Sequence, residues 1–111
     1  MRETEFDASA IETLVEDIGE SSAREVLLVF FKDAAEKVAL LSAIESADEI
    51  DAITRHTHSI KSAAAAFGFT RISSLARKIE NEAAGQSMAA IKADIAALRA
   101  AVENAHALSL F

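Results

Sequence analysis

Cysteine, proline, tryptophan and tyrosine are all absent from this chain of 111 residues, and glycine occurs only 3 times. Without cysteine there is no disulfide, no thiolate nucleophile and no cysteine-ligated metal. No Asn-Gly or Asp-Gly hairpin signal occurs either, and alanine is abundant. Because tyrosine and tryptophan favour strands while alanine favours helices, the sequence predicts an all-α fold.

Long apolar runs are missing as well. No uninterrupted apolar stretch reaches the roughly 18 residues of a membrane span, and the acidic start MRETEFDASAIE is unlike a signal peptide. The length suffices for one core and is too short for an additional catalytic domain. We therefore expect a single domain over residues 1–111 that is soluble and cytoplasmic.

Basic residues are outnumbered, with 11 lysines and arginines against 18 acidic residues and a net charge of −7. This negative field repels nucleic-acid phosphates and anionic membranes, so neither is an expected partner. The distribution is uneven, because no acidic residue occurs between Ala52 and Ile79. The basic residues of this window are Arg55, Lys61, Arg71, Arg77 and Lys78. Such a cationic window suits a local encounter with an anionic group.

Apolar residues recur at helical spacing in five segments. The expected helices run from about Asp7 to Ile18, from Ser21 or Ser22 to Ile44, from Asp48 to Phe67, from Thr70 to Gly85, and from Ser87 through Ala105. Asp48, Thr70 and Ser87 are expected N-caps, Ser22 and Glu25 form an expected capping box, and Gly19, Gly68 and Gly85 are expected left-handed C-caps. Short links between the long helices predict an antiparallel four-helix bundle, with the short N-terminal helix lying across it.

The second helix contains an apolar run, VLLVFF at residues 26–31, that covers more than one turn. One helix face cannot bury all of it. Either the short first helix covers the excess, or part of the run stays exposed for a partner. The phenylalanines Phe30, Phe31, Phe67 and Phe69 are expected to belong to the core.

The candidate site is the stretch HSIKSAAAAFGF, from His58 to Phe69. At about 100° per residue, His58 falls opposite the apolar seam of its helix and should be accessible. A neutral imidazole offers a nucleophilic nitrogen near neutral pH. Lys61, one turn on, would place an ammonium beside incoming phosphoryl oxygens and disfavour protonation of the ring. Ser62 is small enough to let a bulky partner approach.

The spacing of His58, Lys61, Ser62 and Gly68 resembles the signature of histidine-containing phosphotransfer (HPt) domains, closely from His58 to about Ala84. The family most often has glycine where Ser62 stands. HSIK followed by FGF is also similar to the phosphoacceptor domain of chemotaxis histidine kinases, which carry ATP-binding and dimerisation domains that this chain lacks.

This resemblance implies a phosphorelay carrier in a two-component system, without catalytic turnover of its own. A receiver domain's phosphoaspartate would give its phosphoryl group to His58, and another receiver would take it away. The magnesium ion would belong to the receiver, so we expect neither cofactor nor metal in this chain. Family members of this size are commonly monomers.

Glu80 is the candidate to accept the second ring N–H of His58, because many HPt domains carry Glu or Gln at this position. Gly68 lies ten residues after His58 and twelve before Glu80, so antiparallel packing would bring the two to similar heights. The family also implies an apolar docking patch on the second and third helices, with Arg55 and Arg77 as charges at its rim.

Several alternatives remain open at the sequence level. Glu80 could instead pair with Arg77 or Lys78 on its own helix, and the chain could be a helical adaptor that binds a signalling partner without accepting phosphate. An autonomous enzyme is disfavoured, since the sequence has no P-loop, nucleotide motif or carboxylate cluster. His56 and His58 point about 200° apart and cannot share a metal, and His106 is expected to be inert surface.

Overall fold

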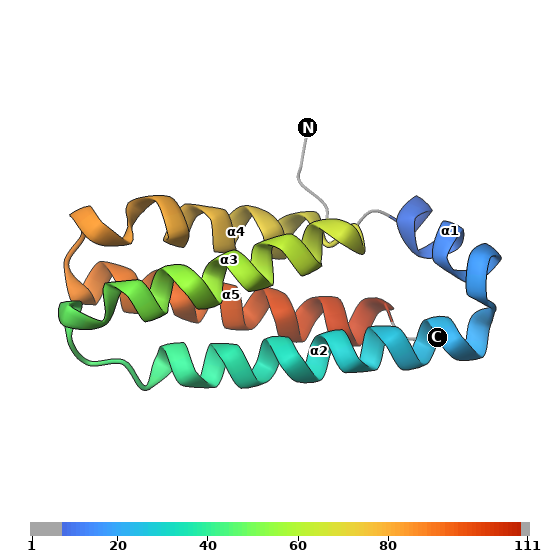
Figure 1. Cartoon of the computed structure of the whole chain (residues 1–111), viewed down its shortest axis with the longest axis horizontal. Coiled ribbons are helices and arrows are strands. Elements are labelled where there is room, and N and C mark those ends of the chain that lie inside the picture. Colours follow the sequence, from blue (N-terminus) through green and yellow to red (C-terminus); the bar gives the residue numbers. More distant parts are fainter. Residues whose placement is uncertain (1–7, 110–111) are drawn as a thin grey trace.

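A computed structural model describes residues 8–109, and 5 α-helices account for most of them (Figure 1). The helices are α1 (Ala8–Ile18), α2 (Glu20–Ser42), α3 (Ile50–Ala66), α4 (Thr70–Glu82) and α5 (Met88–Ser109). Two short 3₁₀ helices, Ala47–Glu49 and Ala83–Gly85, precede α3 and follow α4. No strand occurs within residues 8–109, and the all-α prediction is confirmed. The expected helix start at Asp7 lies outside the described residues.

Four of the helices form a bundle along the long axis of the molecule (Figure 1). From α2 to α5, each helix runs antiparallel to the one before it, and α1 turns off at the end of the bundle where α2 begins. One apolar core joins them, to which α1 contributes Ile11. The predicted four-helix bundle with a short extra N-terminal helix is therefore confirmed. None of the helices within residues 8–109 is long and apolar enough to cross a membrane.

The inward face of α3 fixes which of its side chains reach solvent. Ile53, Thr57, Ile60 and Ala64 are buried, at the spacings of three and four that the sequence shows. Thr57 is polar, but its hydroxyl donates to the carbonyl of Ile53 at 2.8 Å, so its burial leaves no unpaired donor. With this seam turned inward, the opposite face of α3 is left exposed.

The apolar run on α2 is only partly buried. Leu27, Phe30 and Phe31 lie in the core, whereas 43% of Leu28 and 68% of Val29 are exposed. Part of the run therefore stays uncovered in the described structure, which is the second of the two explanations given above. Of the four phenylalanines expected in the core, three are buried and Phe67 is only half-buried.

Glycine makes two of the sharp turns between helices. Gly68 has a φ of +80° and Gly19 a φ of +86°, in the left-handed region that residues with a Cβ disfavour. The N–H of Phe69 donates to the carbonyl of Ala64 at 2.9 Å, which belongs to a Schellman motif that ends α3. Gly85 lies in a 3₁₀ helix and does not have a positive φ, so the left-handed prediction is wrong there.

The N-caps were predicted less well than the helices. Ser87 is confirmed, because its hydroxyl accepts the N–H of Ala90 at 3.2 Å. The capping box of Ser22 and Glu25 and the caps Asp48 and Thr70 are wrong, since the N-cap positions of α2, α3 and α4 are Gly19, Glu49 and Phe69. At α2 the physical reason is that the helix begins directly after Gly19, so Ser22 lies inside its first turn and not at the N-cap.

Candidate functional site

His58 lies midway along α3 on the face opposite the buried seam, and 60% of its side chain is exposed. The spacing of the apolar residues had predicted this orientation. An imidazole at this place is open to a visiting molecule while its backbone is held in a packed helix.

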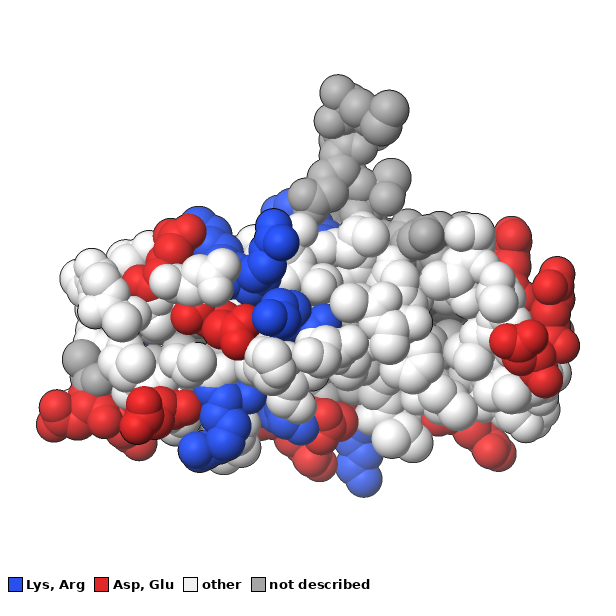
Figure 2. All heavy atoms as spheres, turned by 45° about the horizontal axis from the view of Figure 1, so that its top comes forward, with Lys and Arg blue, Asp and Glu red and all other residues white. Residues whose placement is uncertain are grey.

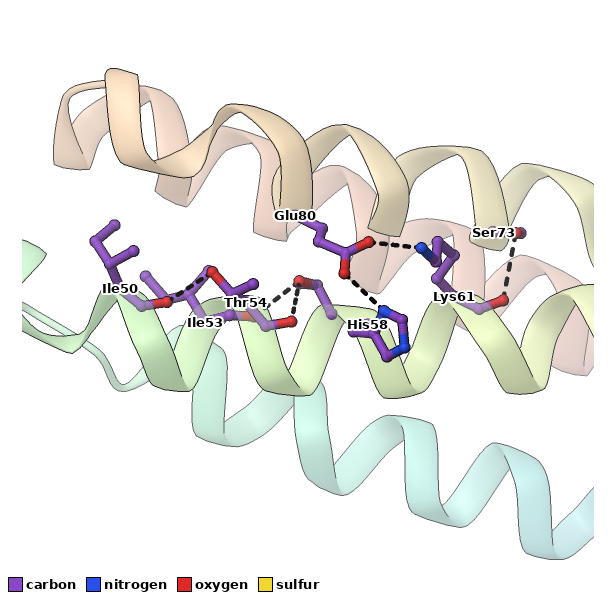
Figure 3. A network of polar contacts seen from close by, with 8 residues as sticks. Ile50, Ile53, Thr54, His58, Lys61, Ser73 and Glu80 are labelled. Atoms are coloured by element: carbon purple, nitrogen blue, oxygen red, sulfur yellow. Dashed lines mark hydrogen bonds and ion pairs between the residues drawn. The ribbon is translucent and has the colours of Figure 1, made fainter.

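The ring of His58 is held from the neighbouring helix. Glu80 extends from α4 towards α3, and its Oε2 lies 2.7 Å from Nδ1 of His58 (Figure 3). The two residues meet because the turn at Gly68 folds α4 back along α3 (Figure 1). The antiparallel packing assumed from the sequence is thus observed, and it brings this pair into contact.

The second oxygen of the same carboxylate binds Lys61. The Nζ of Lys61 lies 2.7 Å from Oε1 of Glu80 (Figure 3). Glu80 of α4 therefore contacts two side chains of α3, His58 and Lys61, which are one turn apart. The hydrogen bond from Lys61 holds the pKa of Glu80 below its ordinary value, against the opposing effect of burial, and the bond with His58 lowers it further. Glu80 is therefore ionised at neutral pH.

An ionised carboxylate can only accept hydrogen bonds. In the neutral ring of His58, the nitrogen beside Glu80 must therefore carry the hydrogen, and Nε2 must carry the lone pair. This assignment of the tautomer follows from the hydrogen-bond partner. Nε2 lies on the side of the ring turned away from Glu80 (Figure 3). The contact thus leaves a nucleophilic nitrogen on an exposed ring.

The other ion pairs of α4 bear on the alternative for Glu80. Lys78 binds Asp94 of α5 at 3.0 Å and approaches Glu82 at 3.9 Å. Both oxygens of Glu80 contact side chains of α3 instead. The structure therefore favours the contact across the two helices over pairing of Glu80 within α4.

A further bond between α3 and α4 was missed in the sequence. The hydroxyl of Ser73 on α4 donates to the backbone carbonyl of Lys61 at 3.3 Å (Figure 3). This bond ties the two helices together one turn beyond His58. Nothing in the sequence signals it, because a serine on a helix surface is common and the bond depends on how α4 is rotated.

The remaining predicted residues do not contact the ring of His58 in the described structure. Ser62 is exposed on the next turn of α3, and Gly68 is the turn that aligns α3 with α4. Arg55 and Arg77 are also exposed, and residues 8–109 hold no ion pair for either of them. Basic side chains gather in the middle of this face of the molecule (Figure 2).

An apolar groove of about 500 Å³ lies between α2 and α3. Its lining residues are Glu25, Val26, Val29, Phe30 and Asp33 from α2, with Ala63 and Phe67 from α3. The sequence had indicated the apolar run on α2, but not the two acidic residues at its edge. Which residues of two helices face each other depends on their relative rotation, which the sequence of each helix alone does not give.

The other histidines take no part in this site. His56 is half-buried on α3, and no group of His, Asp and Glu among the described residues could hold a metal ion. His106 is exposed, as expected, but the expectation that it has no partners is wrong. Its ring stacks on that of Phe31, with the ring centroids 4.6 Å apart. An exposed imidazole here covers a core phenylalanine.

Comparison with known proteins identifies a family for this chain. A family model described as the Hpt domain matches residues 25–107 of the chain. No curated protein and no solved structure matches. The matched range contains α3, α4 and most of α2 and α5, and with them His58, Glu80 and the groove.

Proposed function

Because the chain belongs to the Hpt domain family, whose function is histidine phosphotransfer in two-component signalling, we propose that His58 is its phosphoacceptor. A receiver domain with a phosphorylated aspartate gives its phosphoryl group to His58, and another receiver domain takes it away. The chain acts as a carrier between these partners and has no catalytic turnover of its own. We also propose that it works in the cytoplasm as a monomer.

One observation carries this proposal, namely the exposed imidazole whose Nδ1 is bonded to an ionised carboxylate. Phosphoryl transfer depends mostly on positioning and on neutralising charge. Glu80 provides the positioning, because it holds the ring in one orientation and one tautomer. Nε2 is then the atom that meets the phosphorus.

The transfer of the phosphoryl group to His58 requires no general base on this chain. The lone pair of Nε2 forms the new N–P bond, and the P–O bond to the partner's aspartate breaks, so that the aspartate leaves as a carboxylate. No proton has to be removed from Nε2. The ring gains positive charge as the bond forms, and the Glu80 carboxylate beside Nδ1 stabilises that charge. A magnesium ion for this step is expected in the receiver domain.

We assign supporting roles to the neighbouring residues. Lys61 neutralises charge on the phosphoryl oxygens, for which its flexible side chain has to turn from Glu80 towards Nε2. Ser62 leaves room for the receiver, and Arg55 and Arg77 contribute positive charge at the rim of the contact. The aspartyl phosphate of a receiver is anionic, which agrees with the basic side chains in the middle of this face (Figure 2).

The proposal is tested by incubating the protein with a phosphorylated receiver domain and following the label. We expect label on this chain that is stable in base and labile in acid, as a phosphoramidate is. It should vanish in His58→Gln and persist in the control His56→Gln. Binding of the receiver without any label would favour the adaptor alternative. Label that persists in His58→Gln would place the acceptor elsewhere.

A further inference from the structure

The charges along the groove between α2 and α3 are of one sign. We infer that this groove selects receiver domains whose docking helix carries an apolar side chain with a lysine or arginine one turn away on each side. Glu25 and Asp33 are the residues that determine this specificity. The inference rests on the proposed function, and it adds to it the chemistry of the partner's contacting helix.

The groove is shaped to take an apolar side chain. Val26 and Phe30 of α2 line it with Ala63 and Phe67 of α3, and its volume is about 500 Å³. The ring of Phe30 lies against that of Phe67, with the centroids 5.6 Å apart, so the two helices are in contact within the groove. An inserted apolar group would thus contact carbon on both sides.

Carboxylates mark both ends of the α2 edge. Glu25, Val29 and Asp33 follow one another at intervals of four residues, so each carboxylate lies about 6 Å along the axis from Val29. Val29 is 68% exposed and stands between them. Among the residues that the structure describes, no lysine or arginine lines the groove. A partner therefore meets an apolar centre with negative charge on either side of it.

The two carboxylates differ in whether a basic side chain of this chain already pairs with them. Asp33 is bonded to Lys37 at 2.6 Å, although 53% of its side chain remains exposed. Glu25 is exposed, and residues 8–109 provide it with no ion pair. Glu25 is thus the more available of the two for a cation from a partner, and its reversal should have the larger effect.

A helix lying along α2 would match this pattern at helical spacing. Residues four positions before and after its apolar anchor lie about 6 Å away along the axis, as the two carboxylates do. Lysine or arginine at those positions would pair with Glu25 and Asp33, whereas acidic residues would be repelled. Charges at the rim of an interface act mainly on association rate and on the choice of partner.

The groove lies near His58 along the axis of α3. Ala63 and Phe67 follow His58 by five and nine residues on the same helix, so the groove begins about one and a half turns from the ring. An uncharged area beside the basic residues extends over this face (Figure 2). A receiver with its acidic phosphorylation site over His58 would present its docking helix to the acidic edge of α2.

The test measures binding apart from phosphotransfer. A panel of receiver domains, with and without the flanking lysine or arginine pair, is titrated against the protein in the His58→Gln background. Glu25→Lys and Asp33→Lys are compared with Glu103→Lys, which makes the same change of charge at an exposed residue of α5. The titrations are repeated at low and at high salt.

We expect the receivers with the basic pair to bind more tightly. Glu25→Lys should weaken their binding by roughly tenfold at low salt and by less at high salt. Replacing the receiver's basic pair with glutamate should restore binding to Glu25→Lys. The inference is overturned if Glu25→Lys and Asp33→Lys behave like Glu103→Lys, or if sedimentation shows that the groove holds a second copy of this chain.

The two proposals fail in different ways in this experiment. If His58 of the unmodified protein takes up label from a receiver but the charge reversals do not change receiver binding, the groove inference is wrong and the carrier role is supported. If the reversals change binding as expected but His58 never takes up label, the carrier role falls and the docking chemistry stands.

Discussion

A single carboxylate links the residues of the site. Glu80 binds Nδ1 of His58 with one oxygen and the ammonium of Lys61 with the other. The first contact sets the tautomer of the ring, and the second keeps the carboxylate ionised. A change at any one of the three side chains should therefore be felt at the other two.

Replacing Glu80 should slow phosphotransfer without unfolding the protein. In Glu80→Ala the ring loses the partner that fixes its tautomer, and we expect transfer to slow roughly 10- to 100-fold, as for other partners that orient an imidazole. Glu80→Gln should lie between, because an amide oxygen can accept from Nδ1 while its NH₂ group repels Lys61. Single-turnover transfer from a phosphorylated receiver measures this. Glu82→Ala serves as the control and should transfer at the normal rate.

The lowered pKa of Glu80 predicts how stability depends on pH. Since the folded state holds this carboxylate ionised more strongly than the unfolded chain, its contribution is present above the ordinary pKa of 4.5 and is lost as the pH falls through the lowered folded-state value. The free energy of unfolding of the native protein relative to Glu80→Ala should therefore decline as the pH falls from neutral to below 4.5. Urea unfolding across this range measures the difference. A difference that grew on acidification would contradict the account.

Lys61→Ala should affect transfer far more than stability. Lys61 is 27% exposed, and ion pairs near the surface contribute about 0–1 kcal/mol. The helical circular-dichroism signal and the melting temperature should stay nearly unchanged, while transfer to His58 slows. A large loss of stability would mean that Lys61 is needed for packing of α3 against α4, and not for the chemistry.

For the helices, the sequence predicted which helices exist and which face turns inward better than it predicted where each helix begins and ends. The apolar residues of α3 recur so regularly that they determine both its inward face and the exposure of His58. The ends depend on local turns, and there Gly19 and the 3₁₀ helix at Ala47–Glu49 replaced the caps expected from serine and aspartate. A capping side chain is a weak preference that a tight turn overrides.

The turn between α3 and α4 gives a direct test at this scale. Gly68→Ala would place a Cβ on a residue with a φ of +80°, and we expect a loss of about 1–2 kcal/mol in the free energy of unfolding. Gly85→Ala is the matched control, because Gly85 lacks a positive φ and a Cβ there would meet nothing within 4 Å. Thermal or urea unfolding of the two variants measures the difference. An equal effect of both substitutions would show that the left-handed turn is not what glycine provides.

At the scale of the whole molecule, the site exists only because two helices lie side by side in one register. The sequence indicated that His58 and Glu80 reach similar heights, since both are counted from Gly68. It did not indicate that Glu80 would also bind Lys61, or that Ser73 would bond across, because these contacts depend on how α4 is rotated. The acidic residues of the groove were not predicted for the same reason, because the groove forms only where α2 and α3 lie side by side.

The central claim is that Nε2 of His58 carries the phosphoryl group while Nδ1 stays bonded to Glu80. The most direct measurement is nuclear magnetic resonance of the phosphorylated protein, labelled with ¹⁵N in its histidines, which detects the coupling between phosphorus and the ring nitrogens. We predict coupling to Nε2 of His58 and a proton on its Nδ1. Coupling to Nδ1, or to a nitrogen of another histidine, would contradict this account.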